Sequence, residues 1–183
     1  MARKFAQILV TIWDDDDFLD LTVHEQWLYI HLTTHADLSY AGAMDWRPRK
    51  IVPKAEGLTL DDIQVAAGVL AAKHYIVIDQ DTEEVLVRSF MRNDGMLKQK
   101  NMGAAVAKAY GSIGSRTISG VVVHELRRLK DENPSWGSWE ALVDTLRKRS
   151  INPYEMGSPN PSGNPSGKGS GNPSEKGFDD PPF

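Results

Sequence analysis

Apolar and polar positions along the first 35 residues predict a short strand followed by a helix. The apolar run over residues 5–13 is β-prone and ends at four consecutive aspartates. Thr22 and Glu25 have the spacing of a capping box, in which each side chain accepts a hydrogen bond from the other residue's backbone N–H. Apolar positions recur at helical spacing from Val23 onward. We therefore expect a helix over residues 23–35, with Val23 on its buried face.

The next segment predicts a loop and two more helices. Residues 36–46 mix small, polar and aromatic residues and are expected to form the loop. Pro48 stands where proline favours the first turn of a helix, which predicts a short helix over residues 48–55. Thr59 is a typical N-cap residue, and the apolar positions after it carry a third helix to about residue 73.

Two β-type runs, residues 75–79 and 85–90, flank a polar stretch and predict a hairpin. Strand, helix, short helix, helix and hairpin follow one another as in a winged helix-turn-helix domain. Three more helical segments are expected over residues 101–110, 116–131 and 138–149. The predicted fold is thus mainly α with a small β-hairpin: a winged helix-turn-helix domain over residues 1–100 and a helical extension over 101–150. The last helices either close the core or form a self-association surface, so a homo-oligomer stays open.

Composition changes sharply after residue 150. Of the last 33 residues, 18 are Gly, Pro or Ser, and seven of the chain's ten prolines lie there. A segment of this composition has too little apolar area to offset the conformational entropy of ordering it. We therefore expect a disordered linker over residues 151–176, followed by an acidic, Phe-terminated tip over residues 177–183.

Charge is unevenly distributed along the chain. Residues 1–90 carry 8 Lys and Arg against 15 Asp and Glu, a net charge of −7, whereas residues 91–150 carry 11 against 6, a net charge of +5. The overall net charge of −4 argues against a protein that coats nucleic acid with its whole surface. It allows one basic face, drawn from residues 91–150.

Several functional classes lack support in the sequence. The chain has no cysteine, and no nucleophile elbow, P-loop or dinucleotide-binding glycine pattern occurs. His31 and His35 share a helix face but lack the acidic core of a metalloprotease motif, so we expect surface histidines. The four aspartates, residues 14–17, are expected to form a solvated turn. We expect no enzyme, no metal, no cofactor and no membrane partner, since no apolar run approaches the length of a membrane span.

Basic residues with few acidic neighbours are the candidates for DNA contact. The main group lies just beyond the hairpin, and a smaller cluster lies around the second helix: Arg92, Lys98, Lys100, Lys108 and Arg116, then Arg47, Arg49 and Lys50. Such residues contact the nucleic-acid backbone without reading its sequence. Either group could equally be a solvated positive surface. The third helix, where a winged-helix protein reads the major groove, offers only Gln64 and Lys73 against two aspartates.

The five tryptophans offer candidates for base stacking. Trp46 and Trp136 fall in predicted loops and are the freer candidates, so Trp46 joins the predicted DNA-binding set. The other three, Trp13, Trp27 and Trp139, lie on patterns that predict core positions.

The segment from Ile12 to about Asn101 resembles a family of small winged-helix proteins carried by actinobacterial phages and prophages. The resemblance rests on four stretches, residues 12–15, 28–32, 37–42 and 87–90. It covers about half of the chain and implies a fold more firmly than a function, because members are described mainly as DNA-binding or replication-associated proteins. It also implies a location in the cytoplasm of a phage-infected actinobacterial host.

The chain's end is similar to the C-terminus of bacterial single-stranded-DNA-binding proteins. Its last residues are Phe178, Asp179, Asp180, Pro181, Pro182 and Phe183. A terminal phenylalanine joins a large apolar ring to an α-carboxylate, which suits a hydrophobic pocket beside a cation, and the aspartates attract a basic rim. The similarity implies recruitment of host replication, recombination and repair proteins. The body departs from that family, since it has no five-stranded OB-fold pattern.

Together these features favour a phage DNA-binding protein of replication or recombination. We expect it to prefer single-stranded DNA of any sequence and to recruit host proteins through its tip. Two alternatives stay open. One is a transcriptional regulator or replication initiator that reads a duplex site. The other is a helicase loader or host-protein inhibitor that acts through protein contacts alone.

Overall fold

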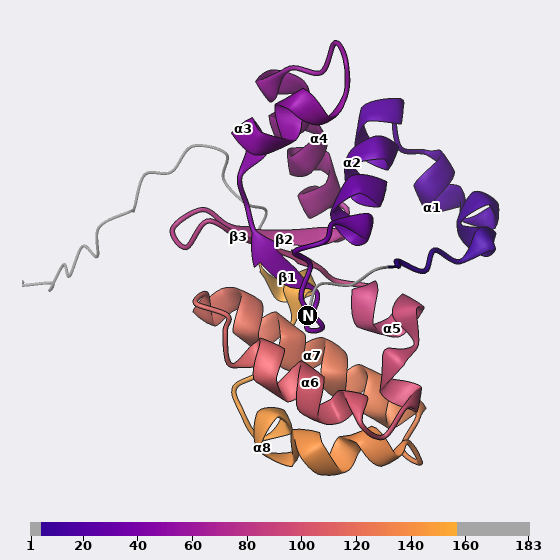
Figure 1. Cartoon of the computed structure of the whole chain (residues 1–183), viewed down its shortest axis with the longest axis vertical. Coiled ribbons are helices and arrows are strands. Elements are labelled where there is room, and N and C mark those ends of the chain that lie inside the picture. Colours follow the sequence, from indigo (N-terminus) through magenta and orange to yellow (C-terminus); the bar gives the residue numbers. More distant parts are fainter. Residues whose placement is uncertain (1–4, 157–183) are drawn as a thin grey trace, which may run out of the picture.

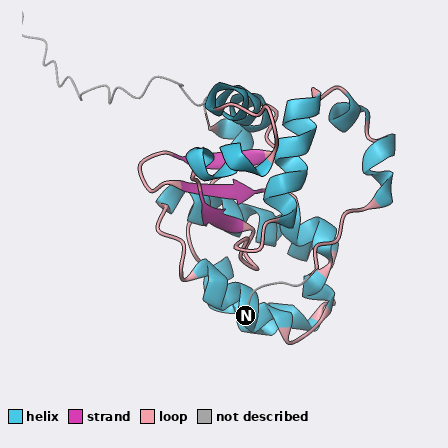
Figure 2. Ribbon diagram, turned by 45° about the horizontal axis from the view of Figure 1, so that its top comes forward, coloured by secondary structure: helices cyan, strands magenta, loops and turns pink. Residues whose placement is uncertain are grey.

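The computed structural model describes residues 5–156, and these form three layers with a small sheet in the middle (Figure 1). On one side lie α2 (Val23–Thr34), α3 (Pro48–Ile51) and α4 (Leu60–Ala72); on the other lie α6 (Met102–Tyr110), α7 (Arg116–Glu132) and α8 (Val143–Leu146). Figure 2 shows the same sandwich, with helices above and below the strands. The remaining elements are α1 (Asp16–Leu19), α5 (Phe90–Asp94) and the 3-10 turns Val10–Asp14, Val52–Lys54, Met96–Lys98, Gly137–Leu142 and Pro153–Glu155.

Both long helices of the first layer begin at capping boxes. Thr22 Oγ1 accepts a hydrogen bond from the Glu25 N–H, and the Thr22 N–H donates to Glu25 Oε2 at 2.8 Å. Thr59 and Asp62 repeat the arrangement at the start of α4. Each box satisfies two N–H groups that the helix itself leaves unpaired. The predictions of these helices and of helices over 101–110 and 116–131 are confirmed within one or two residues.

The sheet contains one more strand than the sequence predicts. β2 (Ile76–Asp79) and β3 (Glu84–Val87) form the expected hairpin, and β1 (Ala43–Asp45) pairs with β3 on its other edge, with Ala43 opposite Leu86. All pairings are antiparallel, in the order β1-β3-β2. β1 lies inside the segment predicted as a loop, and three residues are too short to show a period of two. The order of elements from α2 to β3 is that of a winged helix-turn-helix domain.

One hydrophobic core spans both helical layers. It extends from Phe18 in α1 to Leu142 before α8, and α7 contributes an entire stripe to it: Ile118, Val121, Val122, Leu126 and Leu129. This settles the role of α7, which closes the core with its apolar stripe. Residues on both sides of the boundary expected at residue 100 therefore share one hydrophobic core.

Four local predictions are wrong. Residues 5–9 form no strand and Val10–Asp14 form a 3-10 turn, because no strand of the described chain pairs with them. Trp13 is 56% exposed, since only one side of its ring packs on Phe18, and Val23 is 79% exposed at the first turn of α2. The predicted helix over residues 138–149 is a 3-10 turn followed by the four-residue α8.

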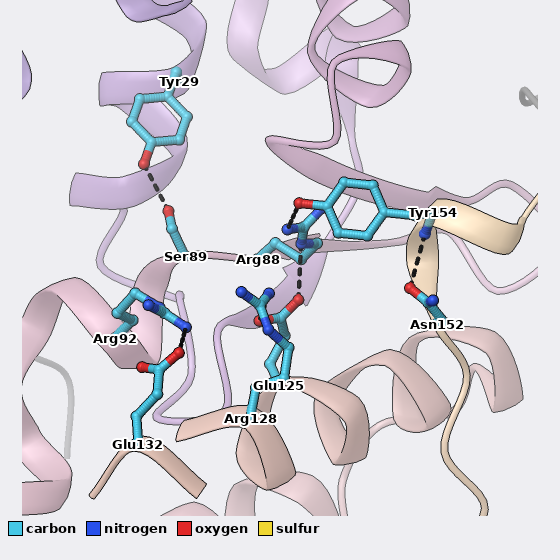
Figure 3. Close-up of polar contacts among 9 residues, drawn as sticks. All are labelled: Tyr29, Arg88, Ser89, Arg92, Glu125, Arg128, Glu132, Asn152 and Tyr154. Carbon is cyan, nitrogen blue, oxygen red and sulfur yellow. Dashed lines mark hydrogen bonds and ion pairs between the residues drawn. The ribbon is translucent and has the colours of Figure 1, made fainter. Parts of the chain in front are cut away.

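A buried ion pair joins the sheet to α7 (Figure 3). Arg88, one residue past β3, places Nε 2.8 Å from Glu125 Oε1, and the two side chains are 11% and 10% exposed. The two atoms are not aligned as a hydrogen bond, so the attraction is mainly that of opposite charges. Arg128 Nη1 lies 3.3 Å from the other carboxylate oxygen. Arg88 Nη2 donates to the Tyr154 hydroxyl at 2.7 Å, and the guanidinium lies over the Tyr154 ring, 4.6 Å from its centroid.

These contacts extend the folded body past the predicted start of the linker. The Ile151 N–H donates to the Gly120 carbonyl at 3.0 Å, and Asn152 Oδ1 accepts from the Tyr154 N–H. The folded body therefore reaches Met156, where we had expected it to end near residue 150. The rest of the predicted linker and the whole tip lie outside the described residues.

The first prediction concerns this ion pair. Glu125→Leu leaves the Arg88 guanidinium buried without its counter-charge, so we expect the free energy of unfolding to fall by about 3–5 kcal/mol, measured by urea denaturation. Asp144→Ala removes the carboxylate of an exposed pair with Arg147, in which the two charged atoms lie 3.4 Å apart, and should lower it by less than about 1 kcal/mol. Equal losses in the two variants would contradict a stabilising role for the buried pair.

Candidate nucleic-acid interface

The predicted DNA-binding residues fall into two groups on opposite sides of the sheet. Arg47, Arg49 and Lys50 lie at and within α3, in the first layer. The main group runs from Arg92 in α5 to Arg116 at the start of α7, in and beside the other layer. The sheet and the core lie between the two groups, so we treat them as separate candidate surfaces.

Trp46, which was predicted to stack on bases, is a core residue. It directly follows β1, its backbone N–H donates to the Glu83 carbonyl at 2.6 Å, and its side chain is only 5% exposed. The pairing of β1 with β3 turns it inward, and that pairing was not visible in the sequence. Trp139 is buried as expected, and of the two tryptophans predicted to be free for stacking only Trp136 keeps part of its surface exposed.

In the α3 group, only part of the charge is available to a ligand. Arg47 Nη2 lies 2.8 Å from Asp45 Oδ2, and both side chains are exposed. Arg49 and Lys50 are exposed in the last turn of α3 and form no ion pair within residues 5–156. The group is therefore small and partly neutralised.

The main group offers more unpaired positive charge. Arg92 pairs with Glu132 at 2.8 Å and Lys100 with Glu140 at 3.0 Å, both on the surface. Lys98, Lys108 and Arg116 are exposed, and the described part of the chain gives them no acidic partner. Surface pairs of this kind contribute at most about 1 kcal/mol, so a phosphate competes readily for the cations of the two pairs.

The main group itself has two parts. Lys98 and Lys100 precede α6, whereas Lys108 lies in its last turn and Arg116 begins the next helix. A helix of nine residues rises about 13 Å, so the two parts lie at opposite ends of α6. This spacing suits a ligand that is itself extended, with several anionic groups along its length.

The α4 surface does not suit a duplex. Its buried face packs on the core through Ile63, Ala66, Ala67 and Leu70. The exposed positions of the helix are Asp61, Gln64, Val65, Gly68 and Ala72, and the helix carries no cation before Lys73 at its C-cap. An anionic groove gains almost nothing from this face. The structure thus supports the argument against major-groove reading by this helix.

A cavity of about 500 Å³ opens between the N-terminal segment, α2 and the start of α5. Its walls include Tyr29 and Tyr75 on one side and Asp15 and Asp17 on another. Burial, together with the nearby aspartates, raises the pKa of Tyr75 to about 12. No sequence pattern indicates this cavity, because its walls come from segments far apart in the chain. Its carboxylates repel phosphate, so we do not include it in the nucleic-acid interface.

The acidic run and the histidines have structural roles. Asp15 caps α1, since its side chain accepts hydrogen bonds from the N–H groups of Asp17 and Phe18. His31 stacks on Trp27, with ring centroids 5.1 Å apart, and its Nε2 is buried without a hydrogen-bond partner among the described residues. The expectation of a surface histidine is wrong for His31. No three His, Asp or Glu side chains of residues 5–156 gather as metal ligands would.

Comparisons of the chain with protein-family models, with curated proteins and with solved structures found no match. Among the described residues, no helix combines the length and the apolar character needed to cross a membrane.

The second prediction follows from His31. Burial, and then the nearby positive charges of His35 and Lys54, lower its pKa below the usual 6.5. The unfolded chain thus takes up this proton at higher pH than the folded chain does, so stability is lost as the pH falls below about 6.5. We expect the urea midpoint to fall between about pH 7.5 and pH 5.5, and to fall less in His31→Gln. His24→Gln serves as the control. It removes an exposed histidine whose Nδ1 lies 3.6 Å from Asp62 Oδ1, a contact that attracts only when the histidine is protonated, so the midpoint should fall at least as much as in the unmodified protein. The same fall in His31→Gln as in the unmodified protein would rule out His31 as the cause.

Proposed function

We propose that this chain is a non-enzymatic DNA-binding protein of phage genome replication or recombination. It binds single-stranded DNA with little sequence preference and acts in the cytoplasm of an actinobacterial host. One observation carries the DNA-binding half of this proposal. Lys98, Lys108 and Arg116 are exposed and unpaired among the described residues, whereas α4 presents acidic and apolar side chains to solvent.

The distribution of charge favours backbone contact over base reading. Cations spaced along α6 can each meet a phosphate of an extended strand, and each contact releases counterions whatever the sequence. A regulator that reads a duplex needs donors and acceptors on α4, and only Gln64 offers them on its exposed face. This is why we place the regulator or initiator second.

The recruitment half of the proposal rests on the sequence of the tip. Phe183 combines an aromatic ring with the terminal carboxylate, and Asp179 and Asp180 stand just before it. This is the chemistry of a ligand for an apolar pocket with a basic rim. We propose that host replication, recombination and repair proteins that bind the tail of the single-stranded-DNA-binding protein also bind this tip.

The third prediction tests DNA binding by fluorescence anisotropy. The untagged protein should bind unrelated single-stranded oligonucleotides with similar affinity, and more weakly at about 200 mM than at about 50 mM salt. Replacing Lys98, Lys108 and Arg116 together with alanine should reduce the slope of log K against log salt by about 2.

Arg49→Ala with Lys50→Ala removes exposed charge on the opposite side of the sheet and tests the α3 group separately: an unchanged slope in this variant excludes that group from the binding surface. Absence of binding by the unmodified protein would overturn the DNA-binding half and favour a protein that acts through protein contacts alone. A sharp preference for one duplex sequence would favour the regulator.

The fourth prediction tests the tip. Removal of Phe183 should abolish the ability of the chain to displace a labelled single-stranded-DNA-binding-protein tail peptide from a host protein that binds this tail. The deletion takes away the aromatic ring and moves the carboxylate to Pro182. DNA affinity should not change, and Ser174→Ala, outside the tip, should leave both activities intact. Full displacement by the shortened chain would refute recruitment through the terminal phenylalanine.

A further inference from the structure

Trp136 stacks on Trp139, a buried tryptophan whose indole N–H is hydrogen-bonded. The rings of Trp136 and Trp139 are nearly parallel, at 9°, with centroids 5.9 Å apart. Trp139 is buried, and its Nε1–H donates to the Asn133 carbonyl at 2.7 Å. Trp136 is half-buried at the N-cap of the turn Gly137–Leu142, and its own N–H donates to the Asn133 carbonyl at 3.3 Å. The partner ring therefore holds the Trp136 indole in one orientation.

The same turn is held against the segment that carries two of the predicted lysines. Ser138 Oγ donates to the Leu97 carbonyl at 2.6 Å, one residue before Lys98. The aliphatic part of Lys100 lies against Gly137, where an added Cβ would stand 3.4 Å from Lys100 Cγ and Cδ. The residue next to Trp136 thus lies beside the lysine stem. Trp136 and these lysines, 36 or more residues apart in sequence, share one corner of the molecule.

Charge at this corner is available to an anionic ligand. Lys98 is exposed and unpaired within the described chain, and the ammonium of Lys100 meets only the exposed Glu140 carboxylate, at 3.0 Å. A pre-oriented aromatic ring beside exposed lysines is the arrangement by which proteins bind single strands: a base stacks on the ring, and the lysines contact the flanking phosphates. In a duplex the bases are already stacked on one another and do not reach such a ring.

We propose that Trp136 is a nucleobase-stacking site and that, with Lys98 and Lys100, it selects single-stranded over double-stranded DNA. This proposal rests on the proposed function and adds to it the residue that makes the distinction between the two forms of DNA. The site accepts any base, because every base has a π-face.

The fifth prediction compares variants of Trp136 in the full chain. Trp136→Ala should weaken binding to an oligothymidylate by about 5- to 150-fold, the usual effect of losing one stacking contact, and leave the weaker duplex binding unchanged. Trp136→Phe should retain most of the affinity, since a phenyl ring still stacks. The control is Trp13→Ala, which removes an exposed tryptophan in edge-to-face contact with Phe18 and should have no effect on DNA binding.

A second readout does not depend on the stability of the alanine variant. Oligothymidylate should quench part of the tryptophan fluorescence of the unmodified protein, and this part should disappear in Trp136→Phe. The stacking site would be overturned if the unmodified protein binds single strands and the Trp136 and Trp13 variants both show the affinity and the quenching of the unmodified protein. The proposed function would still stand in that case. Absence of single-strand binding by the unmodified protein would overturn both.

Discussion

The buried ion pair between Arg88 and Glu125 is the contact on which the joining of the two helical layers depends. Two charges taken out of water are stabilising only if their remaining groups are satisfied, and here Arg128 and the Tyr154 hydroxyl supply part of that compensation. The pair ties the end of β3 to the middle of α7 and, through Tyr154, to the segment that follows the last helix. An apolar contact at this place would tolerate sliding between layers, whereas a charge pair with two further partners, Arg128 and Tyr154, specifies one arrangement.

That arrangement decides which cations reach the surface. The apolar stripe of α7 is buried in the core. Some basic residues of α7 contact other parts of the protein, and others are exposed. Arg127 donates to the carbonyls of Leu146 and Lys148, where it holds the end of α8, and Arg128 turns to Glu125. The long helix with the most charges therefore contributes little to the candidate interface beyond Arg116. The candidate interface lies along the shorter α6, whose neighbouring cations make few contacts within the protein.

The sequence predicted the long helices and the hairpin because each carries its own local signal: a capping residue, an apolar period and a polar end. The strand β1 escaped, because its three residues are stabilised only by pairing with β3, and Trp46 was misplaced along with it. Trp13 and Val23 fit apolar patterns, yet both side chains are exposed. A periodic pattern does not indicate whether another element packs over a given position. The stack of Trp136 on Trp139 and its approach to Lys100 depend on the packing of a turn against α6. No local signal in the sequence encodes that packing.

Net charge alone overstates the number of cations that are available to a ligand. Residues 91–150 carry eleven cations, but the structure commits Arg127 and Arg128 to internal contacts and pairs Arg92, Lys100 and Arg147 with surface carboxylates. The surface pairs are weak enough to exchange for phosphate. In the function we propose, binding depends on a few spaced cations and one aromatic ring rather than on a dense positive surface. The cations of such an interface would give contacts that are sensitive to salt and indifferent to sequence, and the proposed preference for single strands comes from the ring.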